Sequence, residues 1–456
     1  MKNSILIAET VKTLKCASVF SVLTLIGCAT PPLPDHHTDE HIQSAASLAT
    51  AIQFHTNALP AEAAPAPDHL PMFAAVERAL RQSPELQIAL AEVRAAQAAA
   101  NQSRLWPNPV LDIVLRAPEG GGHTVLEAGL AAELTQLLQR PRRISAADAR
   151  LRAASAAALT ATLEVMHDTQ KDYVEAVALR RETVLLGQRA MRLSEMVQLA
   201  ETRQAAGEGS EFEVTTLKAQ HAVANLNLRE ADRRLNDVRF RLAERFGQPR
   251  GRQDWTLATP LQTQIALRGE PDSIAHGLRV RPEVQSDRWQ LAALTDNIAL
   301  ARLAWMEDNA AGLVTERDGD WSLGPSISLP LPVFDNGLAR REQAAAQAIA
   351  ARQRLTQTTR RVVREIRTAH HAVAELMTTT RHARTHMLPL HEQRVTLARK
   401  LFEAGQESAT PLKLAELDLL QAQLQLVRLE SQTALAILQL DRATGGSTLE
   451  IENESR

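Results

Sequence analysis

The amino-acid sequence predicts a mainly α-helical protein with a small β part, built by tandem duplication of one unit. Three observations support this prediction. The sequence aligns with itself without a gap when it is shifted by 198 residues. Two segments of about 65 residues have helical composition and no Gly or Pro near their middle. Short segments between the helices alternate apolar and polar residues, which is typical of strands with one apolar face.

The repeat defines the domain boundaries. LRQSPELQ (80–87) falls on LRVRPEVQ (278–285), Gly207 falls on Gly405, and Gly247 falls on Gly445. A repeat is sought before any local assignment because missing one miscasts the fold. We expect a first helix–hairpin–helix repeat at 71–248, a connector at 249–271, a second repeat at 272–446 and a C-terminal tail at 447–456.

Long helices with narrow apolar seams account for most of the chain. Aromatic residues make up only 3% of it, and Ala, Leu, Gln, Arg and Glu dominate, which suits such helices better than a thick globular core. A helix of 65 residues extends on the order of 100 Å, so it must pack lengthwise against others. The expected helices span 73–104, 141–205 and 212–246 in the first repeat, and 273–304, 338–403 and 412–444 in the second.

Each repeat also contains a candidate β-hairpin. In LEAGLAAEL (126–134) the leucines and alanines oppose Glu127 and Glu133, and WSLGPSISL (321–329) alternates in the same way. The partner strands are 110–116 and the weaker 310–316, and the Gly-containing stretches 120–122 and 317–320 are the expected turns. A membrane strand needs about 9–11 residues, so the second hairpin is expected to be short.

Four strands cannot close a barrel, and an open sheet edge leaves backbone groups unsatisfied in lipid. Three chains would supply about 12 strands, within the range of closed outer-membrane barrels. The sequence therefore favours a homotrimer, with an α-helical barrel of long antiparallel helices below a shared barrel of about 12 strands.

The N-terminus has the pattern of a targeting segment. Lys2, Lys12 and Lys15 precede an apolar run that ends at Leu25-Ile26-Gly27-Cys28, which resembles a bacterial lipobox and is too short for a membrane helix. Residues 1–27 are expected to be a lipoprotein signal peptide, Cys28 the lipidated first residue, and 28–70 a flexible linker. The alternative is an ordinary signal peptide with an incidental cysteine.

The chain resembles the TolC-type outer membrane efflux protein family over nearly all of its mature sequence. Three motifs carry the resemblance: RPEVQSDRWQLAALTDNIALAR, GPSISLPLPVFDNGLARREQAAAQ and the closing segment from EAGQESATPLKLAEL to ALAILQLDRATGG. The resemblance implies a homotrimeric exit duct in the cell outer membrane of a Gram-negative bacterium, extending into the periplasm. Its expected partners are a periplasmic adaptor, an inner-membrane transporter and outer-membrane lipid. The lipid-anchored, heavy-metal branch of the family is the most similar.

The two Gly turns are the expected periplasmic tips, where the resemblance places adaptor docking: Gly207, Glu208, Ser210, Gly405, Gln406 and Thr410. Threefold repetition of nearby acids would form rings at the tunnel mouth, an arrangement that channels use for cation selectivity. The candidate aperture acids are Glu208, Glu211 and Glu407. The alternative is that acids near a helix N-terminus only complement its dipole.

His382 and His386 have the i, i+4 spacing that can share a metal ion, although solvated helix histidines without a metal are commoner. The sequence shows no Ser/His/Asp set, Gly-rich phosphate loop or paired-carboxylate cleft, so we expect no enzyme and no cofactor. The balance of 51 basic and 53 acidic residues gives no reason to expect nucleic acid. The alternatives are a lipid-anchored periplasmic coiled-coil scaffold, and a drug-efflux or type I secretion duct.

Overall fold

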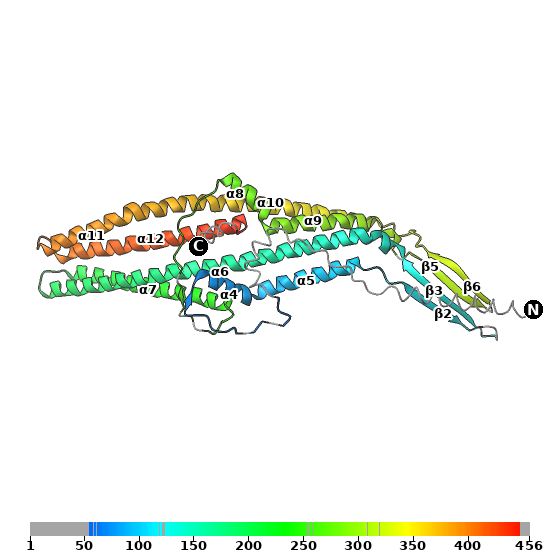
Figure 1. Cartoon of the computed structure of the whole chain (residues 1–456). Coiled ribbons are helices and arrows are strands. Elements are labelled where there is room, and N and C mark those ends of the chain that lie inside the picture. Colours follow the sequence, from blue (N-terminus) through cyan, green and yellow to red (C-terminus); the bar gives the residue numbers. More distant parts are fainter. Residues whose placement is uncertain are drawn as a thin grey trace, which may run out of the picture. The chain divides into compact units, whose positions relative to one another are not determined.

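The computed structural model describes residues 54–446 except 58, 61, 118, 121–123, 252, 254, 258, 308 and 319. The predicted signal peptide, Cys28, most of the linker and the C-terminal tail lie outside the described residues. Within the described part the chain is mainly helical with a small sheet, which confirms the predicted fold class (Figure 1).

Both repeats follow the same order of two short helices, a β-hairpin and two long helical segments, and the second repeat adds two short turns. The first repeat consists of α4 (Met72–Gln82), α5 (Pro84–Arg104), β2 (Val110–Arg116), β3 (Val125–Glu133), α6 (Leu134–Ala205) and α7 (Glu211–Arg245). The second repeat consists of α8 (Glu270–Val280), α9 (Pro282–Ala301), the 3₁₀ turn η1 (Ala304–Met306), β5 (Ala310–Asp318), β6 (Asp320–Ser328), α10 (Leu338–His382), the π-helical turn η2 (Ala383–Met387), α11 (Leu388–Glu403) and α12 (Ala409–Thr444). β1 (His69–Leu70) pairs in parallel with β4 (Thr256–Leu257) in the connector.

The first helix of each repeat is broken, and the prediction of single helices over 73–104 and 273–304 was wrong. Ser83 and Arg281 have extended backbones at the two breaks. Each precedes a proline, which disfavours the helical conformation of the preceding residue and itself suits the first position of a helix. Ser83 caps α5, because its Oγ accepts a hydrogen bond from the Leu86 N–H at 3.1 Å.

Helix α6 begins seven residues before the predicted start, so Pro141 lies inside it. A helix start leaves backbone N–H groups without partners, and here a buried asparagine from the other repeat binds two of them. The Asn309 carbonyl accepts from the Leu134 N–H at 3.3 Å, and Asn309 Oδ1 accepts from the Thr135 N–H at 2.9 Å. This cap joins the two repeats where the sheet meets the helices.

The long segment 338–403 stays helical throughout but contains η2, immediately before Pro389. Proline has no N–H for a helical hydrogen bond, and its ring clashes with the carbonyl of the residue four positions earlier. A π-helical turn is a local distortion that accommodates such a residue within an α-helix. Met191 occupies the corresponding position of the first repeat, and α6 continues there without a break.

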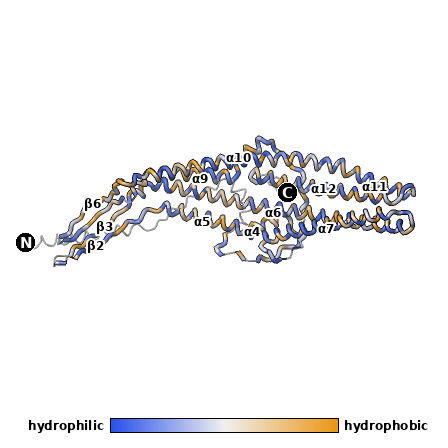
Figure 2. Tube along the Cα trace, turned by 180° about the vertical axis from the view of Figure 1, so that it is seen from behind, coloured by the Kyte–Doolittle hydropathy of each residue, from blue (hydrophilic) through white to orange (hydrophobic). Residues whose placement is uncertain are grey.

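Helices pack lengthwise through narrow seams of Ala, Leu and Val rather than around one thick core. Helix α6, with 72 residues and therefore about 108 Å long, contacts α5, α7, α9 and α12. One cluster of buried residues joins α9, α10 and α12 and includes Val284, Ile366 and Ile437. Apolar and polar residues alternate along the helices (Figure 2). The sheet lies at one end of the helices, and the α6–α7 and α11–α12 turns lie at the other (Figure 1).

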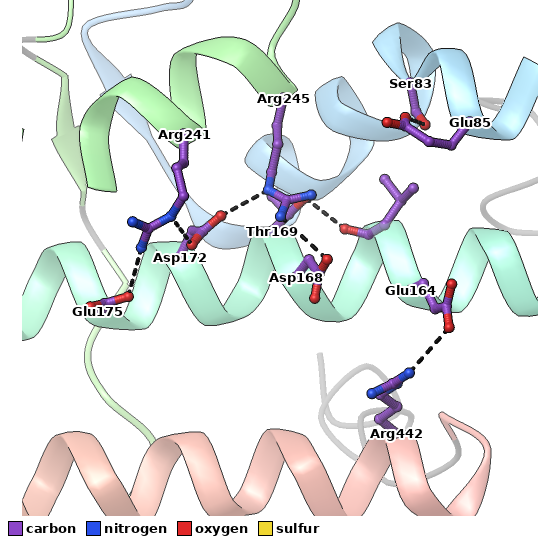
Figure 3. A network of polar contacts seen from close by, with 11 residues as sticks. Ser83, Glu85, Glu164, Asp168, Thr169, Asp172, Glu175, Arg241, Arg245 and Arg442 are labelled. Carbon is purple, nitrogen blue, oxygen red and sulfur yellow. Dashed lines mark hydrogen bonds and ion pairs between the residues drawn. The ribbon is translucent and has the colours of Figure 1, made fainter. Parts of the chain in front are cut away.

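A charged network fixes α7 on α6 midway along the unit (Figure 3). Buried Asp172 accepts hydrogen bonds from Arg241 Nε at 2.9 Å and from Arg245 Nε at 2.8 Å. Arg241 also binds Glu175 at 2.9 Å, and Arg245 lies 3.3 Å from Asp168. Both oxygens of the buried carboxylate are therefore satisfied by cations, which a buried charge requires.

None of the helices in the described part of the chain is apolar over a stretch long enough to cross a membrane.

Candidate functional site

The four longer strands form one antiparallel sheet in the order β2-β3-β5-β6. Residues directly opposite each other lie on the same face, so the register fixes both faces. One face carries every carboxylate of these strands: Asp112, Glu127, Glu133, Glu316, Asp318 and Asp320. The other face is apolar except for Thr315 and Arg317, and contains Leu111, Ile113, Leu115, Leu126, Leu130, Leu313, Trp321, Leu323 and Ile327.

The second hairpin is as long as a membrane strand requires, and the expectation of a short 310–316 strand was wrong. β5 and β6 each have nine residues, because pairing continues through Arg317 and Asp318 into the expected turn. The shortest strand is β2, with seven residues. β2 and β6 are the edges of the sheet, and their apolar side chains are exposed.

The helical tips have the same backbone geometry in both repeats. The Glu208 N–H donates to the Arg203 carbonyl at 2.9 Å, and the Gln406 N–H donates to the Leu401 carbonyl at 3.0 Å. Gly207 and Gly405, which lie within these two turns, have positive φ values of +79° and +70°, respectively. This is the Schellman ending of a helix, which places glycine in the left-handed region. Because both turns need a left-handed residue at this point, the shared geometry explains why glycine occupies positions 207 and 405.

The turn in the second repeat is shorter than predicted. Ser210 caps α7, and its Oγ accepts from the Glu213 N–H at 3.2 Å. Its counterpart in the repeat is Ser408, the residue before α12, so the predicted tip residue Thr410 already lies in the first turn of the helix.

The candidate aperture acids lie at the tips, and Glu208, Glu211 and Glu407 are all exposed. Glu211 is in the first turn of α7, as its dipole favours. Among the described residues no ion pair involves any of these three carboxylates. Glu213 differs, because it lies 3.3 Å from Arg203 across the turn.

A charged cluster joins the two hairpins on the sheet side of the tips. It consists of Arg192 and Glu195 from α6, Arg399 from α11, and Lys413 and Glu416 from α12, and we name it the tip hub. Lys413 Nζ is 2.7 Å from Glu195, which also binds Arg192 at 3.0 Å. Glu416 lies 3.5 Å from Arg192, 3.6 Å from Arg399 and 3.7 Å from Lys413. One oxygen of Glu416 is buried without a hydrogen bond, so its contacts are ion pairs alone.

His382, the last residue of α10, and His386, in the π-helical turn η2, are both exposed, with ring centroids 4.8 Å apart. In the described part of the chain no group of three or more His, Cys, Asp or Glu side chains could hold a metal ion. A two-histidine metal site therefore stays a prediction.

Comparison with known proteins shows what the chain is similar to. Residues 276–446 match the model of the family described as outer membrane efflux protein. The second repeat is therefore similar to this family, as its sequence motifs indicated. The cobalt-zinc-cadmium resistance protein CzcC of Cupriavidus metallidurans is 24% identical over 384 residues, which cover 82% of this chain and 90% of CzcC.

Solved structures of outer-membrane channels share the fold of this chain. The outer-membrane channel OprN superposes with a TM-score of 0.67 at 21% identity, over 82% of this chain and 90% of OprN. The outer membrane protein VceC of Vibrio cholerae superposes with a TM-score of 0.67 at 20% identity, over 82% of this chain and 96% of VceC. These likenesses cover both repeats, and they confirm the resemblance that the sequence motifs indicated.

The two Gly turns were predicted from the sequence, whereas two features beside them were not. The tip hub pairs residues as far apart as Glu195 and Lys413, and only the packing of α12 on α6 reveals it. Phe212, in the first turn of α7, is 80% exposed. The alternation of Phe212 with Glu211 and Glu213 was the available signal for an apolar side chain at the tip.

Proposed function

We propose that this chain forms the homotrimeric exit duct of a tripartite efflux system in the outer membrane. Three sheets close into a barrel of about 12 strands, and the long helices of three chains form the periplasmic tunnel beneath it. The duct is passive: inner-membrane transporter and adaptor deliver the substrate, and the duct carries it to the exterior.

The observation that carries this proposal is the in-register sheet with one apolar and one carboxylate-bearing face and two exposed edges. A face of exposed Leu, Ile and Trp side chains is unfavourable in water. This face therefore argues against a scaffold that stays in the periplasm. In lipid such a face is stabilising, provided that both edges are paired. Pairing β6 of one chain with β2 of the next meets this condition.

The tips are the proposed adaptor-docking surface. The tip hub is the proposed catch, by which we mean the set of ion pairs that holds the tunnel in its closed form. Two of its ion pairs, Arg192–Glu416 and Lys413–Glu195, join the α6–α7 hairpin to the α11–α12 hairpin. Opening then requires the two hairpins to separate at the Gly turns. A partner that binds the separated form more tightly than the closed form shifts the equilibrium of the duct towards the open form. Lipidation of Cys28 adds anchorage to the membrane.

The proposed substrates are heavy-metal cations, because CzcC, which covers both repeats at 24% identity, is named a cobalt-zinc-cadmium resistance protein. A bacterial strain that lacks this chain is expected to become sensitive to cobalt, zinc and cadmium ions, while its sensitivity to drugs and detergents stays unchanged. The reverse pattern identifies a drug-efflux duct, and loss of an exported protein identifies a secretion duct.

The same strain tests the tips. A Gly207→Val, Gly405→Val variant is expected to restore resistance poorly, because valine at positive φ is strained and distorts the docking surface. The matched control is Gly120→Val in the β2–β3 turn, where the added side chain also meets nothing within 4 Å and φ is not positive. Equal rescue by both variants would contradict docking at the tips.

We also propose that the aperture acids favour cations. Threefold copies of Glu208, Glu211 and Glu407 would line the tunnel mouth with carboxylates, which attract cations and repel anions. Changing all three to Gln is expected to lower the cation-over-anion permeability ratio measured from reversal potentials in a salt gradient. Glu230→Gln, on an exposed face of α7, is the control. An unchanged ratio in the triple variant would show that these acids only complement helix dipoles.

A further inference from the structure

An ordered loop with exposed apolar side chains follows β6. Residues 329–337, with the sequence LPLPVFDNG, connect β6 to α10. Phe334 is fully exposed at 103% and Leu331 is 82% exposed. The corresponding residues of the first repeat, 131–139, end β3 and begin α6 instead. This loop is therefore a feature of the second repeat alone.

Polar contacts within the loop fix its conformation. Asp335 accepts from the Gly337 N–H at 2.8 Å and pairs with Arg340 at 2.6 Å. Asn336 Oδ1 accepts from the Leu338 N–H at 3.0 Å, and the Asn336 carbonyl accepts from Arg341 at 2.7 Å. A loop held in this way loses little entropy on binding. Its large exposed apolar side chains therefore indicate an interaction surface.

A second exposed apolar pair lies at the opposite edge of the sheet. Leu105 and Trp106 precede β2, and both are exposed. The guanidinium carbon of Arg140 lies 4.6 Å from the centroid of the Trp106 ring, and Arg140 donates to the Arg104 carbonyl at 2.7 Å. Arg140 thus covers one face of the indole and leaves the rest of it accessible.

The strand directions bring the two surfaces together. β6 runs towards the helical end of the unit and β2 runs away from it. When β6 of one protomer pairs antiparallel with β2 of the next, the loop after β6 lies beside the segment before β2. We propose that Leu331 and Phe334 pack on Leu105 and Trp106 of the partner subunit, forming an inter-protomer clasp at the sheet–helix junction.

The clasp rests on the proposed function, because it requires the β6–β2 closure. It gives each interface an aromatic anchor outside the hydrogen-bonded strands, and buried aromatic anchors carry much of the binding free energy of an interface. The occupant of the loop surface is a second copy of this chain. The membrane interface is the competing occupant, and the experiment separates the two.

The first test places the photo-crosslinking amino acid p-benzoylphenylalanine at position 334 of the full chain in native membranes. The expected product has twice the chain mass, with the crosslink in the tryptic peptide Leu105–Arg116. Crosslinking to lipid alone would overturn the clasp. The same amino acid at position 321, on the apolar face of β6, is the control and is expected to crosslink lipid.

The second test compares Phe334→Ala and Trp106→Ala with Phe334→Leu in the purified trimer. We expect each alanine variant to weaken trimer association at least about tenfold, the double variant to add little to either, and Phe334→Leu to keep most of the affinity. Additive losses would overturn the clasp. Native chains that form no trimer and no pore would instead contradict the proposed function.

Discussion

A Glu195→Gln, Glu416→Gln variant is expected to conduct more than the native protein in planar bilayers. The substitutions leave Arg192, Arg399 and Lys413 close together without carboxylates, so the cations repel one another and the hairpins separate. Partly exposed ion pairs contribute little individually, and a loss on the order of 1–2 kcal/mol over the tip hub raises the open-to-closed ratio about 5- to 30-fold. Single-channel recording measures this ratio directly.

The control is Glu230→Gln, which removes a pair with Arg233 inside α7 at 2.7 Å and leaves the hairpins joined. Hydrogen bonds from Lys413 and from Arg192 hold the pKa of Glu195 below its ordinary value of 4.5. The catch is therefore complete above that value and is lost as the pH falls through the lowered pKa. An open-to-closed ratio of the native protein that rises as the pH falls below the ordinary pKa of Glu195 fits this sign, whereas equal open-to-closed ratios in the native and variant proteins would exclude the hub as a catch.

Arg281→Ala is expected to destabilise the folded protein by about 3–5 kcal/mol, because it breaks a buried charge group by removing one partner. The Arg281 side chain, at the break between α8 and α9, is only 4% exposed and binds Glu283 of α9 at 2.7 Å and Glu365 of α10. Without Arg281 two partly buried carboxylates face each other. The midpoint of chemical denaturation, followed by circular dichroism, measures the loss.

The matched control is Arg367→Ala, which removes an exposed pair with Glu270 at 2.8 Å and should cost about 1 kcal/mol or less. Burial raises the pKa of Glu283, and the Arg281 guanidinium more than offsets this, so the pKa lies below its ordinary value. The stabilisation that the Arg281–Glu283 pair gives the folded protein is present above the ordinary pKa of Glu283. It disappears as the pH falls through the lowered pKa that Glu283 has in the folded protein. The variant's deficit should therefore shrink in acid. A deficit no larger than that of Arg367→Ala would contradict the structural role of Arg281.

Local residue patterns were sufficient for the elements whose partners lie nearby in the sequence. The alternation in 126–134 and 321–329 identified two strands within one residue, and the glycines at 207 and 405 marked turns that need a left-handed backbone. The helix breaks before Pro84 and Pro282 were equally readable, because proline restricts its predecessor. These two breaks were not predicted, because the alignment of the two repeats suggested one long helix in each half.

Features that depend on the other repeat could not be predicted from local patterns. The start of α6 at Leu134 depends on Asn309, 175 residues further along the chain from Leu134. The tip hub needs α12 to lie on α6, and no periodicity within either helix identifies that partner. The extra length of β5 depends only in part on the first repeat, because Arg317 pairs with Leu126 of β3 as well as with Trp321 of β6, whereas Asp318 pairs with Asp320 of β6 alone.

The central claim is that three copies of this chain close their sheets into one pore. Its most direct test is the conductance of the purified, full-length oligomer in a planar lipid bilayer, with its mass measured in the same detergent. We expect a trimer that inserts and gives discrete conductance steps, raised by the tip-hub variant. A monomer, or a trimer that never conducts even with the tip hub removed, would contradict it.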